Sequence, residues 1–171
     1  RRAPGDEEIP EVPEGYTARD VYARIVQKKL GEEYEQDFSG YSTAQTLDSI
    51  EYFVFPNFFI FPGLSLPMAN RFRPDPEDPD YSFFDLYFLR PSHPEKAPPP
   101  PPDPLILDVD DSYTQAEGLG FLGAVYDQDT SNMAAQTRGF KACARGSQTL
   151  GNYQECRIRH LHKRVNDYVQ N

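Results

Sequence analysis

Two aspartates separated by one residue are the first side chains in this sequence that could carry chemistry. Asp127 and Asp129 lie in AVYDQDTSNMAAQTRGF, residues 124–140, where a short apolar run meets a predicted helix. Aspartate is favoured at helix starts, because its carboxylate accepts free backbone N–H groups and faces the positive end of the dipole. A carboxylate can also bind a metal, but non-haem iron commonly requires two His and one carboxylate. The local pattern favours capping and leaves metal binding open.

The three histidines do not form a recognisable metal site. His160 and His162 are two residues apart, so on a helix they point in different directions and cannot bind one ion together. His93 lies in a proline-rich segment and is expected to be solvated. The glycines of EGLGFLG have neither the spacing nor the strand–helix context of a phosphate loop. The aspartates therefore remain the main candidates.

Composition excludes several classes of protein. The chain has 171 residues, enough for one domain with a core, and its 38% hydrophobic content is too high for a disordered protein. A net charge of −10 argues against nucleic-acid binding, which needs clustered Lys and Arg. Cys143 and Cys156 form no CxxC pair, and no apolar run is long enough for a membrane span. We therefore expect a reduced, cytoplasmic setting with no membrane or nucleic-acid partner.

Residues 1–16 are acidic and proline-rich and are expected to be a linker or extended arm without a signal peptide. Residues 17–171 are expected to form one domain, interrupted by a proline-rich loop at residues 91–104 whose prolines favour polyproline II. Thr17 and Asp20 have the spacing of a capping box, which predicts a helix from about residue 18 to residue 35.

Aromatic-rich segments at hairpin-like spacing predict an antiparallel sheet. The four predicted strands lie in SIEYFVFP, NFFIFPG, MANRFRP and YSFFDLYFLRP. LILDVD, residues 105–110, predicts a further short strand, and apolar spacing predicts helices over residues 128–144 and 150–169. The predicted class is α+β, with an antiparallel sheet followed by helices that can pack against its face.

Four segments in order resemble one known family. EYFVFPNFFIF, YDQDTSN, TRGFKA and YQECRIRHLHKRVNDYV resemble the C-terminal catalytic part of Rieske-type aromatic ring-hydroxylating oxygenase alpha subunits, over about residues 40–170. The resemblance implies a helix-grip (START/SRPBCC-like) fold, in which an antiparallel sheet curls around a long C-terminal helix and leaves a pocket.

The resemblance also implies a mononuclear non-haem Fe(II) held by two His and one Asp. Counting back from Gly139, Asp129 best fits the iron carboxylate, with Asp127 as the fallback. A helix start would help keep Asp129 ionised. Asn57 is a candidate substrate-pocket residue, with a structural polar role in the sheet as the alternative.

The same resemblance places the iron histidines and the Rieske domain, with its [2Fe–2S] cluster, upstream of residue 1. This chain is then an incomplete fragment that is inactive alone. The whole enzyme would insert oxygen from O2 into an aromatic or other apolar substrate, as a cis-diol or a hydroxyl. It would take electrons from a reductase or ferredoxin, and it could include a beta subunit and form a trimer.

Two other functions stay open. The first is a non-catalytic helix-grip module that binds an apolar ligand without metal. The second is an interaction protein that uses the proline-rich loop as an SH3 or WW ligand.

Overall fold

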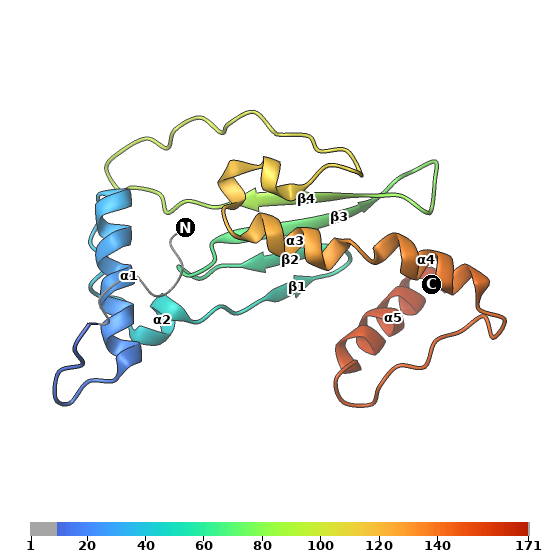
Figure 1. The fold of residues 1–171 in the computed structure, drawn as a ribbon, viewed down its shortest axis with the longest axis horizontal. Helices are drawn as coiled ribbons and strands as arrows, with labels where there is room; N and C mark the ends of the chain where they lie inside the picture. Colours follow the sequence, from blue (N-terminus) through green and yellow to red (C-terminus); the bar gives the residue numbers. More distant parts are fainter. Residues whose placement is uncertain (1–9, 171) are drawn as a thin grey trace. The chain divides into compact units, whose positions relative to one another are not determined.

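The computed structural model describes residues 10–170, which form two compact units. One unit ends at Pro100 and the other begins at Pro101, within the proline-rich segment. Most of the predicted arm lies outside the described residues, and residues 10–16 form no helix or strand. Figure 1 labels the helices α1–α5 and the strands β1–β4.

The first unit opens with a capped helix. Helix α1, Ala18–Tyr34, follows Thr17, and the two halves of the predicted capping box are present. The Thr17 hydroxyl accepts the Asp20 N–H over 3.2 Å, and the Asp20 carboxylate accepts the Thr17 N–H over 3.0 Å. The predicted helix is therefore confirmed in its position and in its start signal.

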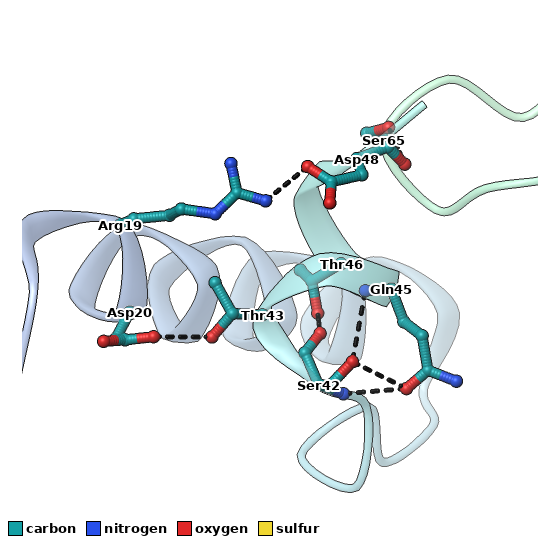
Figure 2. A network of polar contacts seen from close by, with 8 residues as sticks. All are labelled: Arg19, Asp20, Ser42, Thr43, Gln45, Thr46, Asp48 and Ser65. Atoms are coloured by element: carbon teal, nitrogen blue, oxygen red, sulfur yellow. Dashed lines mark hydrogen bonds and ion pairs between the residues drawn. The ribbon is translucent and has the colours of Figure 1, made fainter. Parts of the chain in front are cut away.

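A second capping box begins helix α2, Thr43–Leu47, through Ser42 and Gln45. The carboxylate of Asp20 also accepts a hydrogen bond from the Thr43 hydroxyl over 2.7 Å, and Arg19 forms an ion pair with Asp48 (Figure 2). These contacts join the two helices through polar side chains.

The sheet is a four-stranded antiparallel meander in the order β1-β2-β3-β4. Its strands are β1, Tyr52–Val54; β2, Phe58–Phe61; β3, Met68–Pro74; and β4, Ser82–Phe88. Each strand pairs with the next one in the chain, as the hairpin-like spacing of the aromatic segments predicts (Figure 1). The predicted antiparallel sheet is confirmed.

The two faces of the sheet differ in chemistry, because side chains alternate along a strand and directly paired residues share a face. One face, here called the phenylalanine face, follows from the strand register and consists of Phe53, Phe59, Phe61, Met68, Asn70, Phe72, Pro74, Ser82, Phe84, Leu86 and Phe88. The opposite face carries Arg71, Arg73 and Asp85.

Ring contacts run across the phenylalanine face from strand to strand. Phe53 and Phe59 have ring centroids 4.8 Å apart, Phe59 meets Phe72 edge to face at 5.8 Å, and Phe72 stacks on Phe84 at 4.5 Å. Aromatic pairs in such geometries add about 0.5–1.5 kcal/mol each beyond the buried area.

The second unit is helical. Two short 3-10 turns, η1 at Tyr113–Gln115 and η2 at Glu117–Leu119, precede helix α3, Leu122–Thr130. Helix α4, Met133–Ala142, and helix α5, Cys156–Val169, complete it. The α+β class, with an antiparallel sheet and C-terminal helices, is confirmed and is consistent with part of a helix-grip domain.

Three predictions about individual elements are wrong. Residues 105–110 form no strand: no described strand pairs with them, and the Ile106 and Val109 side chains are 78% and 85% exposed. The helix expected over residues 128–144 is instead divided at Ser131 and Asn132, where the Ser131 hydroxyl donates to the Gln128 carbonyl and competes with the helix ladder.

The last helix begins at Cys156 rather than Leu150. The residues before it form a loop that side chains of the helix hold. The Glu155 carboxylate accepts the Gly151 N–H, and the Arg159 guanidinium donates to the carbonyls of Gly151 and Asn152.

Candidate functional site

Asp127 and Asp129 lie in the C-terminal half of α3, not at the start of a helix. Helix α3 begins at Leu122, so the apolar run before the aspartates is itself helical. The predicted helix-start capping is therefore wrong. The predicted place of Asp129 at a helix start is also wrong, since Asp129 lies near the C-terminus of α3.

A contact distant in sequence explains the earlier start of α3. Gly123 is buried, and a β-carbon at this position would lie 3.0 Å from the Tyr113 carbonyl oxygen and 3.0 Å from the Thr114 Cα. The rings of Tyr113 and Tyr126 also contact each other, with centroids 5.6 Å apart. The first turns of α3 therefore pack directly on η1.

Asp127 holds the turn that precedes α3. Its carboxylate accepts a hydrogen bond from the Ser112 hydroxyl over 2.6 Å and another from the Tyr113 N–H over 2.9 Å. Asp127 is half-buried, so these bonds are partly shielded from water. The Asp127 carboxylate therefore caps η1 and not the helix to which Asp127 belongs.

Asp129 differs from Asp127 in both exposure and bonding. It is exposed, and its carboxylate forms no hydrogen bond or ion pair with the residues that the structure describes. Residues two apart on a helix lie about 200° apart around its axis, so the two carboxylates cannot share one ion. Of the two, Asp129 has the carboxylate that is available to an added ligand.

The described residues do not assemble an iron site by themselves. Between residues 10 and 170, no three His, Cys, Asp or Glu side chains are grouped so that they could hold a metal. His93 accepts a hydrogen bond from the Glu95 N–H over 3.1 Å, and His160 and His162 are exposed on α5. The described residues therefore do not supply a complete metal centre by themselves.

Asn57 lies in the turn before β2, and its side chain is hydrogen-bonded to β3. Its side-chain amide donates to the Phe72 carbonyl over 2.5 Å, and the Phe72 N–H donates to the Asn57 carbonyl over 3.0 Å. This is the structural role that the sequence left as an alternative. A role for Asn57 in a substrate pocket stays a prediction.

Asn70 is a polar residue of the sheet that is not among the candidates predicted from the sequence. This residue lies at the centre of β3 and is only 8% exposed, and its Oδ1 is buried with no hydrogen-bond partner among the described residues. The signal was available, because Asn70 shares a strand face with Met68 and Phe72 and is thus polar at a position where a core residue is expected.

On the opposite face, Asp85 is bound by two arginines. The Arg73 guanidinium donates to both carboxylate oxygens, over 2.7 and 3.0 Å, and Arg71 Nε donates over 2.8 Å. The hydrogen bonds from Arg73, followed by those from Arg71, lower the pKa of Asp85 to about 2. This cluster stabilises the β3–β4 pair, and the arginines occupy both oxygens of the Asp85 carboxylate.

Comparison with known proteins identifies the family. The model of the ring hydroxylating alpha subunit (catalytic domain) family matches residues 15–171. No curated protein and no solved structure matches the chain. Within residues 10–170, no helix combines the length and apolar character that a membrane crossing requires. The match covers both units, and so the chain belongs to the family of ring-hydroxylating alpha subunits, as part of their oxygenase catalytic domain.

Proposed function

We propose that this chain is the C-terminal portion of the catalytic domain of a ring-hydroxylating oxygenase and that Asp129 is the carboxylate ligand of its mononuclear Fe(II). The observation that carries the proposal is the contrast between the two aspartates of α3. The Asp127 carboxylate is occupied by Ser112 and Tyr113, whereas the Asp129 carboxylate is exposed and unpaired among the described residues.

The other iron ligands would come from outside residues 10–170, because the described residues offer no grouped donors. Two histidines and one carboxylate leave open positions at the metal, which suits reaction with oxygen. In this family the iron supplies the activation of O2 for insertion into an aromatic substrate. The chain's own part would be to hold one ligand on a helix and to provide apolar surface that keeps water away.

The phenylalanine face is the apolar surface best suited to contact an aromatic substrate. Its edge-to-face and stacked ring pairs show that flat rings already pack on one another there. Asn57, in the turn before β2, is the proposed polar residue of the pocket. The same family membership supports a Rieske [2Fe–2S] cluster, a reductase or ferredoxin partner, a trimer with or without a beta subunit, and a cytoplasmic location as parts of this proposal.

Iron content tests the proposal most directly. The protein at its natural length would be expressed with iron, and iron per chain would be measured for the wild type, Asp129→Ala and Asp127→Ala. We expect Asp129→Ala to lose mononuclear iron and keep its thermal stability. Asp127→Ala should keep iron and lose stability, because its carboxylate holds η1.

The reverse pattern would transfer the ligand role to Asp127. If neither variant changes the iron content, the ligand proposal fails. If the wild type binds aromatic compounds but no mononuclear iron, the alternative of a non-catalytic binding module replaces the oxygenase.

A further inference from the structure

The phenylalanine face contains one polar side chain at its centre. Asn70 is paired with Phe59 on β2 and with Leu86 on β4, and Met68 and Phe72 flank it along β3. All four neighbours are apolar, so none of their side chains can satisfy an amide. Asn70 thus interrupts the apolar character of this face in the middle of the sheet, whereas Ser82 lies at its end.

The side-chain oxygen of Asn70 is an unsatisfied hydrogen-bond acceptor in a buried position. Its Oδ1 is fully buried with no hydrogen-bond partner in the described part of the chain, and the residue as a whole is only 8% exposed. Leaving a buried acceptor unpaired costs about 1–3 kcal/mol, and native proteins rarely retain such groups without a reason. An apolar residue at this position would therefore give a more stable folded state.

Asn57 shows that this sheet can satisfy an asparagine. The amide of Asn57 donates to the Phe72 carbonyl, on the strand that also carries Asn70. Asn70 lacks such a partner among the described residues because the side chains around it on the phenylalanine face are apolar. A partner for Asn70 has to approach from the phenylalanine face, because its backbone faces neighbouring strands on both sides.

We propose that Asn70 selects substrates by hydrogen bonding to a hydroxyl or N–H group on an otherwise apolar aromatic ring. The phenylalanines would pack against the ring, and the amide would pair with its polar substituent. A site built to bond such a group rejects an analogue that lacks it, because the buried polar atom is then left unpaired. This inference rests on the proposed function and narrows its substrate class from aromatic compounds to aromatic compounds with a hydrogen-bond donor.

The test compares phenol with toluene, which have the same ring and differ in the donor. Binding of each would be measured by ligand-observed NMR titration on the protein at its natural length, without turnover. We expect the wild type to bind phenol about tenfold more tightly than toluene, which corresponds to about 1.4 kcal/mol. In Asn70→Leu the ratio should fall to near one, with toluene binding retained.

The Tm provides a second readout. If the role of Asn70 were purely structural, replacing it would lower the Tm. Asn70→Leu should raise the Tm of the ligand-free protein, because it removes an unpaired buried acceptor. The matched control is Tyr87→Phe, which removes a hydroxyl from the opposite face of the sheet and should leave the phenol-to-toluene ratio unchanged.

Three outcomes would overturn the inference. The first is a wild-type phenol-to-toluene ratio near one, or no measurable binding of phenol at all. The second is an unchanged ratio in Asn70→Leu. The third is a lower Tm in Asn70→Leu, which would mean that water or another segment already satisfies the amide. The wild-type ratio decides even if the variant does not fold. Because binding is measured without turnover, this inference can fail while iron content still supports Asp129, and the reverse also holds.

Discussion

The carboxylate of Asp127 accepts the backbone N–H of Tyr113 over 2.9 Å, which ties helix α3 to a turn fourteen residues earlier in the chain. The Ser112 hydroxyl binds the other oxygen of the same carboxylate. Asp129, two residues later, makes no such contact with the described residues. The two aspartates therefore have separate physical roles, and this difference can be measured.

Replacing Asp127 should destabilise the helical unit. Asp127→Ala removes both hydrogen bonds at η1, and the loss of a capping carboxylate costs about 1–2 kcal/mol. Asp129→Ala should change the free energy of unfolding by less than about 0.5 kcal/mol, as exposed substitutions usually do. Urea denaturation of both variants measures the difference, and equal destabilisation would argue against the separation of roles.

Acid should weaken the β3–β4 pair through Asp85. Its pKa is lowered to about 2 in the folded protein, from an ordinary value of 3.8. The folded state therefore favours the ionised form, and the resulting stability is fully present above about pH 4 and is lost as the pH falls towards 2. The Tm of wild type and Asp85→Asn, measured between pH 5 and 2, should converge at the acid end.

Asp20 contributes to the same acid transition and has to be separated from Asp85. Hydrogen bonds from Thr17, and then from Thr43, lower the pKa of Asp20 to about 2. Asp85→Asn should therefore remove only part of the acid dependence. If Asp85→Asn has the same Tm profile as the wild type, the arginine contacts carry no measurable stability.

Two glycine positions should respond in opposite ways to alanine. In Gly123→Ala the added methyl would meet backbone atoms of Tyr113 and Thr114 at 3.0 Å, and such overpacking costs about 1–3 kcal/mol. In Gly139→Ala nothing lies within 4 Å, so the variant should stabilise α4 by up to about 1 kcal/mol. Thermal unfolding compares them, and a neutral Gly123→Ala would contradict the packing of α3 on η1.

Asn57→Ala separates the two roles considered for this residue. The bond to the Phe72 carbonyl alone predicts a free energy of unfolding lower by about 1 kcal/mol with substrate KM unchanged, whereas the proposed pocket role predicts a raised KM as well. A changed KM at unchanged stability would instead support the pocket role. Denaturation and steady-state kinetics on the same preparation distinguish these results.

The elements that the sequence predicts correctly are those with local signals. Thr17 and Asp20 identify the start of α1 three residues apart, and alternating aromatic residues identify the strands of the meander. One wrong prediction, the start of α3, depends on a contact with a separate segment. The start of α3 rests on the packing of Gly123 against Thr114, which no local pattern contains.

The candidate site shows the same limit. The sequence could identify Asp127 and Asp129 as carboxylates with two possible roles, but only the fold shows which one is occupied. Residues 105–110 have the composition of a strand, yet their backbone pairs with no described strand. Asn70 was visible in the sequence, but its unpaired oxygen depends on three strands meeting around it.

The strand order β1-β2-β3-β4 also has a consequence for how the chain folds. Every ladder joins strands that are neighbours in sequence, so each hairpin can close over a short loop at little entropic cost. Proteins whose contacts are mostly local cross their folding barrier faster than those with long-range pairings. The sheet can therefore grow one hairpin at a time from either end, and it acquires its phenylalanine face before any contact with distant parts of the chain is required.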